Sequence, residues 1–180
     1  MGESLKKVIA DNLKAYRSEK GWSLSRTAQE TTVSKAMLGQ LERQESSPTM
    51  ATMWKIAKGF DLPLSALIEP GLLHSKKAGP TPDKLDDIFQ YKILFPFDPK
   101  LGSEMFLLVL PAGKESYSNA HAKGVVEDIV VISGMLDIFI EGQWQSLKAG
   151  EVLRFDADQE HAYRNSTAEN AVFHNIIHYR

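Results

Sequence analysis

Hydrophobic positions near the start of the chain recur with the period of an α-helix. Leu5, Val8, Ile9 and Leu13 share one helical face, and residues 53–60 carry a second face of the same kind. Residues that favour the start of a helix precede further segments, namely Ser23, Ser34, Thr49 and Pro63. The pattern predicts five short helices before residue 70.

After Pro82 the pattern changes to the two-residue alternation of β-strands. Leu136, Ile138 and Ile140 alternate with other residues, and Glu141-Gly142 then forms a tight turn. The predicted strands are 91–95, 104–110, 128–133, 135–140, 152–155 and 170–179. Many short strands joined by close turns predict a β-sandwich or barrel, so the expected fold class is a multidomain α plus β protein.

Residues 74–82 separate the two patterns, because they contain small residues and two prolines but no apolar period. The predicted organisation is a helical domain over 1–72, a linker over 73–90 and a β-domain over 91–180. Charge divides in the same way: residues 1–80 carry 12 Lys/Arg and 8 Asp/Glu, whereas 81–180 carry 9 and 15, within a net charge of −2. A basic helical half suits a polyanionic partner, with chance fluctuation as the alternative.

Composition excludes several classes of protein. The chain has 180 residues and no cysteine, which rules out disulfides, thiolate metal sites and a cysteine nucleophile. Its apolar runs, such as 106–110, are far shorter than the ~20 residues of a membrane span. The first residues lead into an amphipathic pattern and not into a signal peptide, so we expect a cytoplasmic protein.

Residues 23–43 hold two short helices on either side of a break at 31–33, as in a helix-turn-helix. In the second helix Leu38 and Leu41 share a face that would be buried. The residues on or near the other face suit base edges in the major groove, and they are Lys35, Ala36, Gly39 and Gln40. The candidate phosphate contacts are Arg26, Gln29, Ser34 and Arg43. A helical bundle that contacts only proteins is the alternative.

Several motifs in this region resemble the phage-repressor-like helix-turn-helix of the xenobiotic-response-element (XRE) regulators. They are 22–25, 28–29, 33–43, 47–49 and 62–64, and the resemblance covers about residues 5–69. One departure is Gln44, where many members carry Asn or Gly in the turn after the recognition helix. The resemblance implies a sequence-specific DNA-binding domain with a double-stranded DNA operator.

The β-half contains two histidines and a glutamate that are candidate metal ligands. His121 and Glu127 lie six residues apart on extended chain, and His161 follows a strand and a turn. Two imidazoles and one carboxylate that converge inside a barrel make a three-ligand site for a divalent transition metal. A metal-free barrel in which both histidines form hydrogen bonds is the alternative.

The same segments resemble the cupin family over about residues 100–178. Gly150, His161 and Asn165 match the spacing of its second motif, although Asp156 and Asp158 replace the usual Pro and Gly. Of the first motif the chain keeps three residues, His121, Glu127 and Gly134, while Lys123 stands where a second histidine belongs. The resemblance implies a double-stranded β-helix, or jelly-roll, barrel with a divalent metal such as zinc, nickel, iron or manganese.

Four further residues are candidates for binding an effector. Lys123 is either a partner for Glu127 or a contact for a ligand carboxylate. Arg154 would bind an anionic group if it points into the barrel, whereas an outward, solvated arginine is the alternative. Tyr163 and His174 are candidate pocket residues, while His178, four residues beyond His174, is expected at the surface.

Together the two resemblances imply a transcriptional regulator whose cupin domain senses a small molecule. Residues 21–26, 33–40 and 176–179 are similar to the SutR-like regulators, which are linked to sulfur utilisation, so the implied effector is an amino acid or a sulfur metabolite. A homodimer on a palindromic operator is expected, because one recognition helix buries little surface. The alternatives are a cupin isomerase or dioxygenase fused to a DNA-binding domain, and a barrel that only dimerises.

Overall fold

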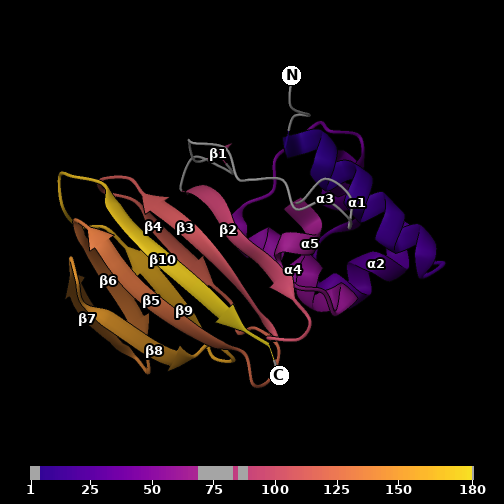
Figure 1. Ribbon diagram of the computed structural model, residues 1–180. Coiled ribbons are helices and arrows are strands. Elements are labelled where there is room, and N and C mark those ends of the chain that lie inside the picture. The colour runs from indigo at the N-terminus through magenta and orange to yellow at the C-terminus, as the bar shows by residue number, and fades with distance from the viewer. Residues whose placement is uncertain (1–4, 69–82, 85–88, 180) are drawn as a thin grey trace. The chain divides into compact units, whose positions relative to one another are not determined.

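The computed structural model describes residues 5–68, 83–84 and 89–179 (Figure 1). The chain divides into two compact units, Met1–Lys77 and Ala78–Arg180. Most of the predicted linker lies outside the described residues, although Phe89 within it is buried and Gln90 begins a strand. Among the helices that the structure describes, none combines the length and apolar character needed to cross a bilayer.

Over residues 5–68 the first unit forms five helices, as predicted. They are α1 (Leu5–Glu19), α2 (Leu24–Thr31), α3 (Lys35–Glu42), α4 (Met50–Phe60) and α5 (Ser65–Ile68). Three predicted helix starts are confirmed by their hydrogen bonds, since the side chains of Ser23, Ser34 and Thr49 each accept from the backbone N–H three residues later. Such an N-cap contributes ~1 kcal/mol to a helix, which matters for helices as short as α2 and α3.

The helical unit buries one face of each of its longer helices. Trp22 stacks on Phe60 of α4 with ring centroids 5.0 Å apart. The largest fully buried side chains of this unit are Leu13, Leu38, Leu41, Met53, Ile56, Phe60, Leu64 and Leu67. Burying one such side chain stabilises a fold by ~1.5–3 kcal/mol, so this set provides the core of a small domain.

The turns that follow α2 and α3 use left-handed backbone. Thr32 has φ 55°, and Gln44 has φ 62°. After α3 the N–H of Gln44 donates to the carbonyl of Leu41, and the N–H of Glu45 donates to that of Gln40, which ends the helix. Glycine or asparagine adopts this left-handed conformation more readily than glutamine does. Gln44 therefore forms the turn at a higher conformational cost than Asn or Gly would have at this position.

In its described residues the second unit is all-β and forms ten strands. Its elements are β1 (Asp83–Lys84), β2 (Gln90–Asp98), β3 (Ser103–Leu110), β4 (Glu115–Ser118), β5 (Val126–Ser133), β6 (Met135–Ile140), β7 (Gln143–Lys148), β8 (Val152–Asp156), β9 (His161–Arg164) and β10 (Ala171–His178). They form two antiparallel sheets with the orders β1-β2-β3-β10-β5-β8 and β4-β9-β6-β7 (Figure 1). The predicted cupin barrel is thereby confirmed as the fold class.

Two connections in the β-domain explain its register. The predicted tight turn is confirmed, because Glu141 and Gly142 both have positive φ and Ile140 pairs with Gln143. Gly134 joins β5 to β6 with φ 75°, and a Cβ there would lie 2.4 Å from the carbonyl oxygen of Asn170. Only glycine fits this connection, which holds the end of β5 against the start of β10.

Inward-facing side chains alternate along the strands and form the core between the sheets. In β10, Ala171, Phe173, Asn175 and Ile177 are buried, whereas the residues between them are half-exposed. Glu127 pairs with Ile177 across β5 and β10 and with Phe155 across β5 and β8. Ile177 also pairs with the buried Glu104 of β3, so this register brings two carboxylates to an inward face that is otherwise largely apolar.

Candidate functional site

Helix α3 presents most of the predicted base-reading residues on its exposed side. Ser34, Lys35, Ala36 and Gln40 are exposed in the structure. Gly39 is buried, so the prediction that it lies on the exposed face is wrong. Its Cα faces Arg43 and Leu24, and a Cβ there would lie 3.1 Å from Nη1 of Arg43 and 3.9 Å from Leu24.

The predicted phosphate contacts on α2 and after α3 are also exposed. Gln29 and Arg26 lie on the open side of α2, and Arg26 forms an ion pair with Glu30 at 2.5 Å. Arg43 donates to both carboxylate oxygens of Glu45, at 2.8 and 2.7 Å. If these arginines bind DNA phosphates, each must first give up its carboxylate partner, which lowers the free energy gained from each phosphate contact.

Another ion pair fixes α3 relative to α1. Arg17 donates from Nε and Nη2 to the two carboxylate oxygens of Glu42, at 2.6 and 3.0 Å, and from Nη1 to the carbonyl of Trp22. Both side chains of the pair are mostly buried, with 19% and 11% exposure. Bidentate pairs with low exposure are the stronger kind, so this contact orients the helix that carries Lys35 and Gln40.

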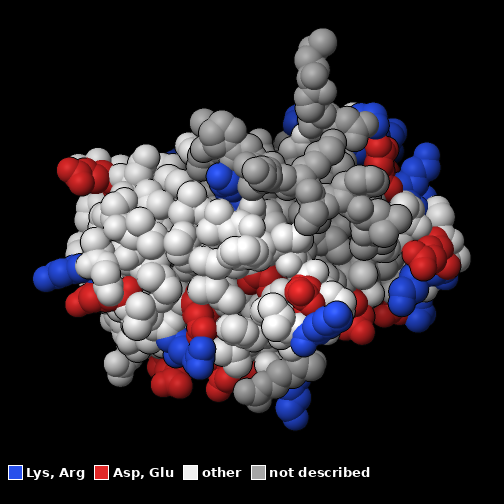
Figure 2. Space-filling model, in the orientation of Figure 1, with Lys and Arg blue, Asp and Glu red and all other residues white. Residues whose placement is uncertain are grey.

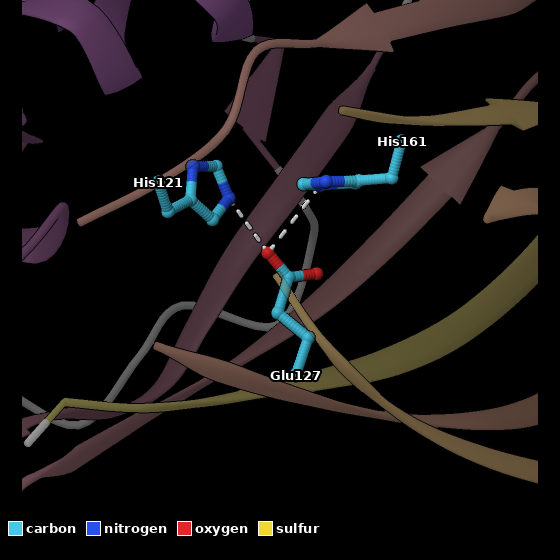
Figure 3. Close-up of side chains that lie close together, drawn as sticks. All are labelled: His121, Glu127 and His161. Atoms are coloured by element: carbon cyan, nitrogen blue, oxygen red, sulfur yellow. Dashed lines mark hydrogen bonds and ion pairs between the residues drawn. The ribbon is translucent and has the colours of Figure 1, made fainter. Parts of the chain in front are cut away.

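The β-domain brings the three predicted metal ligands together in its interior (Figure 3). His121 lies in the loop before β5, Glu127 on β5 and His161 at the start of β9. Their ligand atoms all lie within 4.8 Å of one another, and all three residues are buried. Nε2 of His121 is 2.8 Å from Oε1 of Glu127, and Nε2 of His161 is 3.7 Å from the same oxygen. The sequence spacing therefore predicted a real cluster.

A backbone hydrogen bond orients the His161 ring. Its Nδ1 lies 2.9 Å from the carbonyl of Gln159, and a carbonyl can only accept, so Nδ1 carries the proton. In the neutral ring Nε2 then has a free lone pair that faces Glu127. That atom is buried and has no hydrogen-bond partner among the residues that the structure describes. Two electron-pair donors that face each other in a buried site, here an imidazole nitrogen and a carboxylate oxygen, are unfavourable without a partner. A cation bound between them would accept both electron pairs.

The other oxygen of Glu127 has different partners. Its Oε2 accepts a short hydrogen bond from the hydroxyl of Tyr163 and a bond of 2.9 Å from Nδ2 of Asn175. Burial alone would raise the pKa of Glu127, but the hydrogen bonds and the neighbouring imidazoles outweigh it and lower the pKa to about 2. Glu127 is therefore an ionised carboxylate at neutral pH.

Tyr163 remains a hydrogen-bond donor at neutral pH. Burial raises its pKa well above the usual value, and the adjacent Glu127 carboxylate raises it further. Tyr163 is thus confirmed as an interior residue, but its hydroxyl is already bonded to Glu127. Around the cluster, the Glu127 carboxylate, two imidazoles and two neutral donors lie together, which suits a divalent cation.

Three of the predicted effector contacts lie elsewhere. Lys123 is exposed in the turn after His121 and is not among the partners of Glu127. Arg154 points outward with a side-chain exposure of 71% and pairs with Asp128 at 2.5 Å. Of the two orientations left open for Arg154, the outward one is observed, because Phe155 occupies the inward position of β8.

His174 lies on the opposite face of β10 from Asn175. It pairs with Leu107 of β3 and Val130 of β5 on the outer face of the larger sheet, so its prediction as an interior pocket residue is wrong. Partial burial lowers its pKa. The view in Figure 2 shows few charged side chains over β3 and β10, in agreement with this apolar outer face. His178, which was expected at the surface, is partly exposed and bonds to Asp128.

Sequence reasoning missed Asn175 as a residue of the cluster. The signal was present, because Asn175 is the polar member of a buried alternation whose other members are Ala171, Phe173 and Ile177. Asn165, by contrast, has a structural role. Its Nδ2 donates to the carbonyls of Leu110 and Glu169, and its Oδ1 accepts from Thr167, which fixes the turn after β9.

These two units define a class of protein, a transcriptional regulator with a helix-turn-helix and a cupin domain. The helix-turn-helix family matches residues 13–67, and the cupin domain family matches residues 106–177. The chain belongs to the HTH-type transcriptional regulators of this architecture. It is 47% identical over 98% of its length to the HTH-type transcriptional regulator SutR of Escherichia coli K12, and it covers 98% of that protein.

Solved structures agree with this assignment. A crystal structure of an HTH_3 family transcriptional regulator from Vibrio cholerae is 45% identical, with a TM-score of 0.83, and covers 98% of this chain and 97% of its own. The cupin domain of an XRE family transcriptional regulator from Enterobacter cloacae is 41% identical, with a TM-score of 0.51, and covers 52% of this chain and 99% of its own. The predicted family and the two-domain fold are confirmed.

Proposed function

We propose that this DNA-binding regulator senses a small-molecule effector through a divalent transition metal in its cupin domain. His121, Glu127 and His161 would hold the ion. The observation that carries this proposal is the buried, partnerless Nε2 of His161, which faces an ionised carboxylate that also contacts His121. Zinc fits this donor set best, while nickel, iron and manganese also accept imidazole and carboxylate ligands.

The metal would supply an open coordination position for an electron-pair donor of the effector. An amino acid offers a carboxylate and an amine, and a sulfur metabolite can offer a thiolate, all of which bind divalent transition metals. The chain's own residues keep the site anionic and dry: Glu127 stays ionised, and Phe155 packs its ring 5.2 Å from that of His161. The proposed role is binding and not turnover.

Operator recognition is proposed to use a homodimer. A single eight-residue helix such as α3 buries too little surface for strong specific binding. Two copies would place two recognition helices in successive major grooves of a palindromic operator, with half-sites about 34 Å apart. An effector would change operator affinity if it binds one dimer geometry more tightly than another.

Metal analysis together with operator binding tests the proposal. Untagged protein is expected to contain about one transition-metal ion per chain, and chelation is expected to lower the melting temperature of the β-domain. A thermal-shift screen of amino acids and sulfur metabolites, with and without Zn²⁺, then identifies ligands, and each hit is added to an operator-binding assay. Absence of metal and of any ligand effect would favour a barrel that only dimerises, and conversion of a hit to product would favour an enzyme.

Two glutamines provide a matched test of the DNA interface. Gln40→Ala on α3 is expected to weaken binding to the preferred operator by ~1–3 kcal/mol and to relax the choice of one base pair, because glutamine reads adenine through two hydrogen bonds. Gln29→Ala on α2 is expected to weaken binding to all sequences alike, since phosphate contacts carry no sequence information. Selection from a random DNA library, followed by binding to the selected and scrambled sites, measures both effects. Equal loss of specificity in both variants would contradict the assignment.

A further inference from the structure

The two carboxylate oxygens of Glu127 contact different sets of residues. Oε1 faces both imidazoles, at 2.8 Å from Nε2 of His121 and 3.7 Å from Nε2 of His161, and Figure 3 shows both dashed lines ending on this oxygen. Oε2 faces two neutral donors, the Tyr163 hydroxyl and the Asn175 amide. A carboxylate that is free to rotate can bind a metal through one oxygen or two. Here one oxygen is already engaged.

We propose that Tyr163 and Asn175 are positioning residues that hold Oε2 of Glu127 and leave Oε1 alone to face a metal ion. This inference rests on the metal site proposed above. Hydrogen bonds to a ligating carboxylate fix its orientation, and their loss costs ~10–100-fold in metal affinity in other metal sites. The proposal gives two residues outside the ligand set a measurable role.

Packing fixes both donors independently of any metal. Tyr163 and His161 lie two residues apart on β9, so one strand delivers a ligand and a positioning residue to the same interior. The Tyr163 ring stacks on Phe173 with centroids 5.8 Å apart and meets Phe89 edge-on at 6.3 Å, which leaves its hydroxyl little freedom. Asn175 is 5% exposed and lies on the inward face of β10, the strand that pairs with β5 and so with the strand of Glu127.

Single-oxygen ligation would also influence which ion is accepted. With Oε2 engaged, the protein offers three ligand atoms, which suits a four-coordinate zinc ion with one open position. Calcium, which takes six to eight oxygens and often binds carboxylates through both, would find too few. Tyr163 and Asn175 would therefore favour a transition metal with a free position for an effector.

Tyr163→Phe tests the inference, because it removes the hydroxyl and keeps the ring packing. Tyr117→Phe is the matched control, since Tyr117 lies on β4 with 67% exposure. Zinc affinity is measured by competition with a chelating dye, and the Co²⁺ absorption spectrum reports the coordination of the site. We expect ~10–100-fold weaker zinc binding for Tyr163→Phe, a changed Co²⁺ spectrum and no effect of the control.

Asn175→Leu removes the second donor and is expected to shift affinity and spectrum in the same direction. Unchanged zinc affinity and an unchanged Co²⁺ spectrum in folded Tyr163→Phe would overturn the inference and leave the metal site standing. Failure of the wild-type protein to bind any transition metal would instead overturn the proposed function, and the inference with it. The wild-type measurement therefore separates the two failures.

Discussion

Replacing His161 with glutamine is expected to weaken zinc binding by at least about a hundredfold, or about 2.8 kcal/mol. Loss of a residue that only orients a ligand already costs ~10–100-fold, so loss of one ligand in three costs at least the upper end of that range. The ring of His161 lies 4.9 Å from that of His121 and 5.2 Å from that of Phe155, so glutamine leaves a small gap and keeps a polar atom near Glu127. Competition with a chelating dye measures the change.

His178→Gln is the control for this substitution. His178 is also an imidazole near a carboxylate, at 3.0 Å from Asp128, but its side chain is 36% exposed and lies outside the cluster. We expect its zinc affinity to equal that of the wild-type protein. Equal zinc affinity of His161→Gln and the wild-type protein would contradict the metal site and favour a metal-free barrel in which both histidines form hydrogen bonds.

Local rules in the sequence were sufficient for the five helices, for six of the strands and for the cluster, whereas the short strands β1, β4, β7 and β9 were not among the predicted ranges. Helix starts followed from Ser23, Ser34 and Thr49, because a capping side chain needs only its own helix. The cluster followed from the spacing of His121, Glu127 and His161, which the family resemblance supported. Both depend on contacts within one element or on a motif with fixed spacing.

The errors arose where a side chain's direction depends on the other strands or helices. His174 lies on a strand with apolar residues on both faces, since Val172 and Ile176 flank it outside while Phe173 and Ile177 lie inside. Alternation alone therefore could not choose a face, because the outer face of the larger sheet is itself half-buried. Arg154 differs from His174. The structure buries the adjacent Phe155 on the inward face of β8, so the side chain of Arg154 points outward. Gly39 appeared exposed because a residue without a side chain carries no hydrophobic signal.

Gly59→Ala is expected to destabilise the helical unit strongly and to leave the β-domain unaffected. A Cβ at Gly59 of α4 would lie 2.7 Å from Cα of Thr31 and 2.8 Å from the carbonyl oxygen of Glu30. Both are backbone atoms of α2, so no change of rotamer relieves the contact. Alanine favours a helix by ~1 kcal/mol over glycine, but overpacking costs ~1–3 kcal/mol, and contacts below 3 Å with fixed backbone belong at the upper end of that range, so the clash decides the sign.

A net loss of ~2 kcal/mol lowers the melting temperature of a domain this small by about 8–16 °C. The added Cβ also forces α2 away from α4, which moves the exposed Gln29 and Arg26 relative to α3, so operator binding is expected to fall even below the melting temperature.

Gly39→Ala is the control within a helix, because the nearest atom to its Cβ belongs to the flexible side chain of Arg43. Helical circular dichroism on heating measures stability, and zinc affinity reports the β-domain. Equal melting temperatures of the two variants would show that α2 moves away from α4 without loss of stability. Loss of zinc binding in Gly59→Ala would show that the two units do not fold independently.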